Sequence, residues 1–439
     1  MLQIPFFSDD MIKEYEHIMA DKVKARNSQS TFISFIPGAS YSISIHDLLT
    51  LDRKQIMNID GIRLYMYICS IQKYKTMSNV DFFHSLSIEF PTQVIELEYK
   101  RGHYKYEVNG IPFSQSKKDD TSPDPTIKEG VSLIVSVISG FNATYASKYF
   151  RNAIINSIAD FSRILENMFC DLKQMLKGSV QNNNGNSVYI IDYAILPDNL
   201  RHKLMNSIGL RTCPYCNRNY ITRYGVGGKK STADLDHFYQ KEQYPLFALS
   251  LFNFVPSCPI CNSRMKNIRP SSDTMYPYEE GFGDDVHFEL IYTGADTSSE
   301  KMLHLWQAIK DVSYDDFEVE LIINPSTPPD KKQRIEKSSS LFHLSEVYAD
   351  HKQDALEVAL RTRIYCEGSY EDFCIKLFDK CKQKAGMTNT SVSDLKAFLF
   401  REGFDEEWLK TGVFINNDKK RYDKPLSKMI YDIFNSEKS

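Results

Sequence analysis

Two cysteine pairs with the same spacing constrain this chain more than any other feature of its sequence. Cys213 and Cys216 form one Cys-x-x-Cys pair, and Cys258 and Cys261 form the other. A tetrahedral thiolate site for zinc needs four sulfurs, and one short knuckle supplies only two of them. We therefore predict that the two segments fold against each other around a structural Zn²⁺ ion. A closed four-sulfur site leaves no position for a substrate, so any chemistry has to be sought elsewhere in this region.

The overall composition gives no indication of a particular partner. The 439 residues carry 53 Lys and Arg against 57 Asp and Glu, a net charge of -4, which neither supports nor excludes a nucleic-acid partner. The N-terminus lacks the basic region and apolar run of a secretion signal, and no apolar stretch is long enough to span a bilayer. We expect a cytoplasmic protein without membrane contact. Five unpaired cysteines are expected to be free thiols: Cys69, Cys170, Cys366, Cys374 and Cys381.

Chain length and changes in composition predict an α+β multidomain protein. Polar stretches near residues 114–125 and 181–186 interrupt the regular patterns and mark two boundaries. The expected segments are an α+β N-terminal domain of unassigned role at 1–120, a helical segment with a linker at 121–187, a zinc-containing module at 188–292 and a mainly helical C-terminal domain at 293–439.

Hydrophobic periodicity predicts the regular elements outside the module, because apolar residues recur every three to four positions in helices and every second position in strands. Strands are predicted over 31–35 and 41–45, with a hairpin over 94–99 and 104–108. Helices are predicted from Asp9 onward and over 52–73, 126–178, 300–310, 332–366 and 370–385.

The stretch 211–269 is locally basic, with nine Lys and Arg residues against three Asp and Glu residues. Such a segment is typical of a surface that contacts a phosphate backbone, and equally of a solvated face. The candidates for phosphate contacts are Lys241, Arg264 and Lys266. The glycine-rich residues 225–228 lack the context of a phosphate-binding loop, and we interpret them as a turn before a strand.

Between the cysteine pairs, the pattern predicts two short strands followed by a helix. The first strand ends in Asp236-His237, the second covers 253–257, and the helix begins at Pro259 and carries Asn262. Phosphodiester hydrolysis needs a base for water and a cation for the growing negative charge. Histidine suits the first task, and one carboxylate with one amide oxygen suits a hard divalent ion. Asp234 shares a strand face with Asp236 and is either a second ligand or a surface acid.

This constellation resembles an HNH endonuclease of the ββα-metal type with a four-cysteine zinc site. The resemblance spans about residues 205–285 and leaves most of the chain unassigned. It implies hydrolysis of DNA with His237 as general base, Asp236 and Asn262 holding a catalytic Mg²⁺ or Mn²⁺, and Asn253 bracing the loop that orients His237. The residues that carry it are Cys213-Pro-Tyr-Cys216, Asp236-His237-Phe238, Tyr244-Pro245-Leu246, Asn253-Phe-Val-Pro-Ser-Cys258 and Cys261-Asn262 with Lys266.

Within that family the module is most similar to HNH effectors of bacterial anti-phage systems, such as the HNH subunits of Septu and of retron-associated systems. Gln240 stands where those relatives usually have proline, a change expected to affect loop stiffness more than chemistry. The resemblance implies a regulatory protein partner, with an ATPase as the first candidate. The alternative hypothesis is a zinc-stapled nucleic-acid-binding or adaptor protein without nuclease activity.

Overall fold

The structure, a computed structural model, describes residues 1–70, 94–100, 103–108, 111–116, 134–136, 138–151, 153, 158–181, 185, 187–267, 269, 271, 273–294, 304, 305, 308, 313–366 and 425–438. Its elements are helices and small sheets, which is consistent with the α+β class. The chain forms two compact units, each assembled from separate stretches of sequence. Unit 1 contains Met1–Ser8, Asp198–Phe238 and Val255–Ser439, and unit 2 contains Asp9–Pro197 and Tyr239–Phe254.

Unit 2 begins with the helix and the two strands that the sequence predicts. Helix α1 (Asp9–Arg26) buries a four-residue-spaced row of side chains that includes Tyr15 and Met19. Strands β1 (Phe32–Ser34) and β2 (Ser42–Ser44) pair antiparallel. Helix α2 (Ile45–Thr50) follows at once, because the side chain of Ser44 caps its first turn.

The single helix predicted over 52–73 is wrong within the described residues, which end at Ser70. The structure has two short helices instead, α3 (Arg53–Ile56) and α4 (Ile62–Cys69). Gly61 separates them with φ 84°, a left-handed conformation that ends a helical run. The ring of Tyr41 occupies the space that a side chain at this position would need. Apolar periodicity alone does not reveal such a break.

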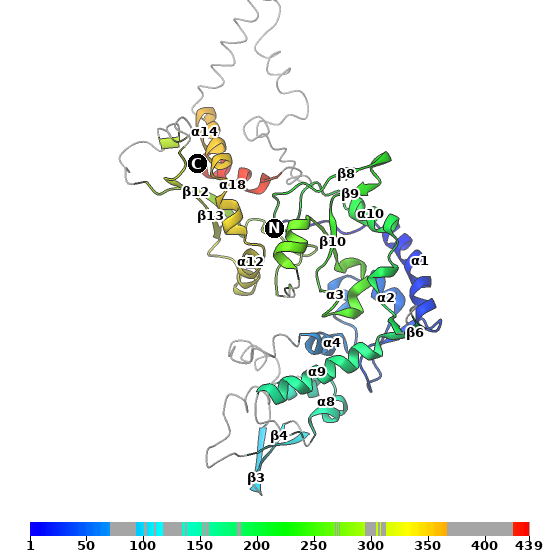
Figure 1. The fold of residues 1–439 in the computed structure, drawn as a ribbon. Coiled ribbons are helices and arrows are strands. Elements are labelled where there is room, and N and C mark those ends of the chain that lie inside the picture. The colour runs from blue at the N-terminus through cyan, green and yellow to red at the C-terminus, as the bar shows by residue number, and fades with distance from the viewer. Residues whose placement is uncertain are drawn as a thin grey trace, which may run out of the picture. The chain divides into compact units, whose positions relative to one another are not determined.

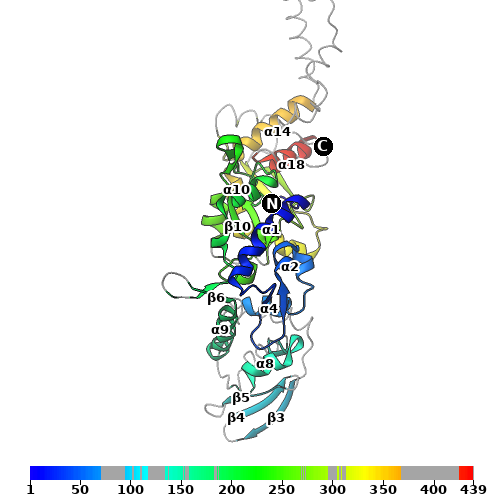
Figure 2. The same ribbon diagram turned by 90° about the vertical axis from the view of Figure 1, so that its right-hand side faces the viewer.

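The middle of unit 2 contains the predicted hairpin and a third strand. Figure 2 shows the strands side by side in the antiparallel order β3-β4-β5. Strands β6 and β7 pair antiparallel, and most of the polar stretch predicted over 181–186 lies outside the described residues. The elements are β3 (Val94–Lys100), β4 (His103–Val108), β5 (Ile111–Ser116), α8 (Ala143–Phe150), α9 (Ile158–Met175), β6 (Lys177–Gln181), β7 (Ser187–Tyr189) and the 3-10 helix η1 (Tyr193–Ile195).

A second stretch of sequence completes the core of unit 2. Two 3-10 helices, η3 (Pro245–Leu249) and η4 (Leu251–Asn253), are buried throughout. The hydroxyl of Tyr15 donates to the carbonyl of Leu249 at 2.7 Å, and the hydroxyl of Tyr65 accepts from the amide of Leu246 at 2.9 Å. These two hydrogen bonds satisfy buried polar groups of η3. They hold in place the part of the chain that follows Asp236 and His237.

The C-terminal part of unit 1 is built on an antiparallel pair, β12 (Val286–Tyr292) and β13 (Phe317–Ile323). Figure 1 shows α14 (Lys352–Cys366) and α18 (Ser427–Lys438) beside this pair, and they share one apolar core that includes Phe288 and Met429. The sequence predicted a mainly helical region here and missed β13. The predicted helical stretch 332–366 is helical but divided into α12 (Pro329–Leu341), α13 (Leu344–Ala349) and α14.

Two further expectations for this region lie wholly or largely outside the described residues, namely the helices over 300–310 and 370–385. No helix within the described part of the chain combines the length and the apolar character needed to cross a membrane. The remaining elements of unit 1 surround the candidate site. They are α10 (Asp198–Ser207), β8 (Arg223–Tyr224), the short turn η2 (Val226–Gly228), β9 (Lys230–Ser231), β10 (Asp234–His237), β11 (Phe254–Ser257) and the π-helix η5 (Ile260–Lys266).

Candidate functional site

The two cysteine pairs meet as the sequence predicts. All four residues are buried, and their Sγ atoms lie within 4.8 Å of one another. A tetrahedral zinc site with Zn–S bonds of about 2.3 Å places its sulfurs about 3.8 Å apart, so little movement separates this cluster from a metal-bound one. The four cysteines therefore form a buried cluster that fits a metal ion such as zinc.

Hydrogen bonds to sulfur support a thiolate cluster. The amide of Arg218 donates to Cys216 Sγ at 3.4 Å, and the amide of Cys261 donates to Cys258 Sγ at 3.4 Å. The side chain of Asn219 reaches Cys258 Sγ at 3.4 Å from the other knuckle, so it links the two pairs directly. N–H donors stabilise the charged form of sulfur, which is the form that binds a metal.

Burial and hydrogen bonds among the four sulfurs shift their pKa values in different directions. Burial raises the pKa of Cys213, whereas the hydrogen bond from the Cys213 thiol lowers the pKa of Cys216. Hydrogen bonds among the sulfurs likewise raise the pKa of Cys261 and lower the pKa of Cys258. A soft divalent ion would replace the remaining protons, because metal binding requires the deprotonated sulfurs.

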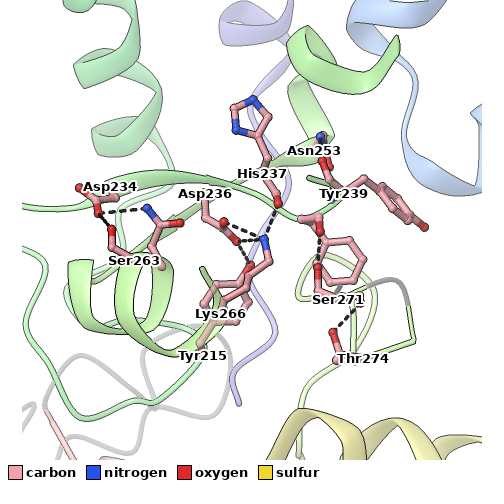
Figure 3. Close-up of polar contacts among 12 residues, drawn as sticks. Tyr215, Asp234, Asp236, His237, Tyr239, Asn253, Ser263, Lys266, Ser271 and Thr274 are labelled. Atoms are coloured by element: carbon pink, nitrogen blue, oxygen red, sulfur yellow. Dashed lines mark hydrogen bonds and ion pairs between the residues drawn. The ribbon is translucent and has the colours of Figure 1, made fainter. Parts of the chain in front are cut away.

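Strand β10 presents its polar residues in alternation. Asp234 and Asp236 share one face, and His237 lies on the other, as the two-residue period of a strand requires. Figure 3 shows the imidazole of His237 on the opposite side of the strand from the carboxylate of Asp236. Strand β10 pairs with β11, and η5 follows β11 after a short connection.

The carboxylate of Asp236 is held in the interior by two partners. Lys266 Nζ contacts its two oxygens at 2.7 and 2.8 Å and also donates to the carbonyl oxygen of His237. The hydroxyl of Tyr215 donates to Asp236 Oδ2 at 2.6 Å. Burial, together with the adjacent carboxylate, raises the pKa of Tyr215 well above its usual range, so the phenol stays a donor. Asp236 therefore joins β10, η5 and the first cysteine knuckle (Figure 3).

Asn262 pairs with the other acidic residue of the strand. Its Nδ2 atom donates to Asp234 Oδ2 at 3.0 Å, and the hydroxyl of Ser263 lies 3.5 Å from the same oxygen. The structure therefore brings together Asp234 with Asn262 and Asp236 with Lys266, rather than Asp236 with Asn262. The two pairs run in the same order along β10 and η5.

Asn253 clamps the chain within unit 2. Its Oδ1 atom accepts from the amide of Tyr239 at 2.7 Å, and its Nδ2 atom donates to the carbonyls of Tyr239 and Phe247, each at 2.9 Å. The side chain is 4% exposed, so these bonds are made without competition from water. Tyr239 stands two residues after His237 in the sequence, in the loop that Asn253 was predicted to brace.

The three candidates for phosphate contacts have different surroundings. Arg264 is exposed on η5, and Lys241 is exposed in unit 2, where its Nζ lies 3.5 Å from Glu242. Lys266 is 1% exposed and engaged by Asp236, so a phosphate contact by Lys266 would require this ion pair to open.

Sequence reasoning did not anticipate the roles of two residues of this site. It predicts a phosphate contact for Lys266 rather than an ion pair with Asp236, and it assigns no role to Tyr215. The signal for Lys266 was present in its spacing, because Asn262 and Lys266 are four positions apart and share a helix face. The position of Tyr215 depends on the folded knuckle, and its sequence context contains no comparable signal.

Comparison with known proteins adds no assignment: no protein-family model, no curated protein and no solved structure matches this chain.

Proposed function

We propose that this protein is a metal-dependent HNH endonuclease that hydrolyses DNA phosphodiester bonds. The observation that carries the proposal is the order of elements around the cysteine cluster. A strand that ends in Asp236-His237 pairs with a second strand. The helix that carries Asn262 begins between the two cysteines of the second pair. A module that only binds nucleic acid has no physical need for a histidine, two acids and an amide in this arrangement.

His237 takes the role of general base in this proposal because it is the histidine of β10 and follows Asp236 directly, with its imidazole on the opposite face of the strand. The imidazole extends from the last position of β10 and is 9% exposed, so it sits in a largely desolvated setting. Asn253 limits the movement of the following loop through its three hydrogen bonds to backbone groups.

In this proposal the oxygen donors of Asp236 and Asn262 would hold a Mg²⁺ or Mn²⁺ ion, which requires Lys266 to release the carboxylate of Asp236. Asp234 adds a carboxylate next to Asn262. These hard donors fit such an ion in kind. The ion would supply a positive charge for the scissile phosphate and the leaving oxygen. Lys266 neutralises Asp236 in the present arrangement, which keeps a buried carboxylate compatible with folding.

The zinc proposed for the four cysteines has a structural role. Cys213 and Cys216 precede β10, whereas Cys258 and Cys261 flank the start of η5. One ion bound to all four would hold the helix with Asn262 against the strand with His237. We further propose that the nuclease acts in the cytoplasm as an effector of anti-phage defence and that a partner protein, with an ATPase as first candidate, controls it.

A cleavage assay tests the proposal. Purified protein is incubated with supercoiled plasmid and Mg²⁺ or Mn²⁺, alongside His237→Ala and the control His17→Ala, which changes an exposed histidine of α1. Loss of a general base lowers the rate by about 10² to 10⁴-fold, whereas the control should cut like the wild type. Equal cleavage by His237→Ala and wild type would refute the role of His237. DNA binding without cleavage by any of the proteins would favour the zinc-stapled binding module.

A further inference from the structure

The β8–β9 hairpin of unit 1 has an exposed apolar tip that the folding of the chain does not explain. Its strands pair Arg223 with Ser231 and Tyr224 with Lys230. The turn between them contains three glycines with positive φ, so it reverses the chain without burying a side chain. Val226 lies at this tip and is 92% exposed.

Exposed apolar side chains gather on this hairpin and just before it in the sequence. The described residues include seven large hydrophobic residues with exposed side chains, and three of them, Tyr220, Tyr224 and Val226, fall within seven consecutive positions. Single exposed apolar residues are common on protein surfaces, but a local group of them marks a contact surface.

The charged residues in the sequence around this group have one sign. Residues 199–233 contain seven Lys and Arg residues and no Asp or Glu. Arg223, Lys229 and Lys230 are exposed on the hairpin itself, and Lys230 Nζ lies 5.9 Å from the centre of the Tyr224 ring. A cationic surface with interleaved aromatic and aliphatic side chains is complementary to a nucleic acid, whose phosphates attract the cations.

The hairpin is also held in a defined position. The guanidinium of Arg223 donates to the carbonyl oxygen of Asn206 at the end of α10, and the side chain of Asn206 donates to the carbonyl of Gly228 at 3.1 Å. The amide of Thr222 donates to Thr232 Oγ1 at 2.7 Å across the base of the hairpin. Both sides of the hairpin are therefore anchored, which lowers the entropy cost of binding. Figure 1 shows β8 and β9 next to α10.

We propose that the β8–β9 hairpin is a duplex-DNA contact element of this protein, in which Lys229 and Lys230 contact phosphates and Val226 enters the groove. This inference rests on the proposed DNA substrate. A two-stranded ribbon fits the wide major groove of B-form DNA, whereas the major groove of A-form RNA is too narrow for side chains to enter. Only two residues separate β9 from β10, so DNA bound by the hairpin would lie near the strand that ends in His237.

The test measures binding and cleavage separately. Affinity for a fluorescent duplex is measured at several salt concentrations with His237→Ala protein, which keeps the DNA intact. Two variants are made in this His237→Ala background: one combines Lys229→Gln with Lys230→Gln, and the other carries Val226→Ser. The control adds Lys13→Gln with Lys22→Gln, which removes two exposed lysines of α1. The substituted side chains are exposed, and thermal unfolding verifies that each variant is folded.

Each phosphate contact contributes about 0.9 to the slope of log affinity against log salt, so losing two lysines should reduce the slope by about 1.8. Val226→Ser should weaken binding about tenfold and leave the slope unchanged, because it removes an apolar contact and no charge. The control should bind like the parent protein.

Unchanged affinity and slope in the double-lysine hairpin variant would overturn the inference. The same measurements are made with single-stranded DNA and with RNA, and a loss of affinity confined to either of them would overturn the assignment to duplex DNA. Cleavage is measured separately, with protein that retains His237. If this wild-type protein cuts DNA and the hairpin variants bind normally, only the proposal for the hairpin fails. If the hairpin variants lose binding and the wild-type protein cuts with neither Mg²⁺ nor Mn²⁺, only the nuclease proposal fails.

Discussion

The buried ion pair between Lys266 and Asp236 stabilises the candidate site. Replacing Lys266 by methionine should lower the unfolding free energy and so measure the effect of breaking this pair. The two side chains are 1% and 5% exposed, so the substitution leaves a carboxylate in the interior without its cation. Breaking a buried pair in this way costs about 3 to 5 kcal/mol of unfolding free energy. We expect a loss near about 3 kcal/mol, the lower end, because the hydrogen bond from Tyr215 at 2.6 Å remains.

A double-substitution cycle separates the pair from the burial of its members. Asp236→Asn alone leaves an unpaired ammonium and should cost about as much as Lys266→Met. Combining the two removes both charges, so the double variant should lie within about 1 kcal/mol of the wild type. The matched control is Lys337→Met, which removes an exposed pair with Asp273 at 3.2 Å and should cost below about 1 kcal/mol.

Urea unfolding followed by far-UV circular dichroism, with zinc at one fixed concentration, measures these free energies. The slope against urea should stay the same across the set, so that midpoint shifts report stability. Two results would refute the reasoning. One is a Lys266→Met protein within about 1 kcal/mol of the wild type, and the other is a double variant less stable than both single variants.

Three further outcomes are expected. Purified wild type should contain one zinc per chain by elemental analysis, and Cys258→Ser should lose it, whereas Cys170→Ser, which changes an exposed thiol, should keep it. Asn253→Ala should lower the unfolding free energy by about 3 kcal/mol in urea, because three buried backbone groups lose their partner, whereas exposed Asn58→Ala should change it by less than about 0.5 kcal/mol. Burial raises the pKa of Tyr215, Tyr278 and Tyr348 well above 10.0, so they keep their protons in the folded unit 1. The unfolded chain releases those protons above pH 10, and stability should therefore fall by about 4 kcal/mol per pH unit there, about 1.4 for each tyrosine, a decline that Tyr348→Phe should lessen by one third. An equally steep decline in Tyr348→Phe and in the wild type would contradict this.

Local sequence patterns predicted much of the fold because they report interactions between near neighbours. Apolar periodicity from Asp9 onward predicted helix α1, and alternation predicted the hairpin of β3 and β4. The same reasoning missed β13, although residues 317–323 alternate between charged and apolar side chains at their start. It also joined α3 to α4, because the conformation of Gly61 depends on the packing of Tyr41 from a different segment.

The cysteine pairs constrained the candidate site most strongly, and the structure brings all four sulfurs together. The sequence also located Asp236 and His237 at the end of a strand and Asn262 at the start of a helix. Their catalytic and metal-binding roles stay predictions. The choice of partners was beyond the sequence, because Lys266 reaches Asp236 across 30 positions of the chain.

The sequence by itself therefore determined several of the regular segments and which four sulfurs can share an ion, since spacing along the chain controls both. Only the tertiary structure decided which buried charge is neutralised by which partner. That outcome depends on the face each strand residue presents and on the helix packed against it. Asp236 is paired with Lys266 and Tyr215, and Asn262 with Asp234, because the cost of burying a charge selects the partner within reach in space.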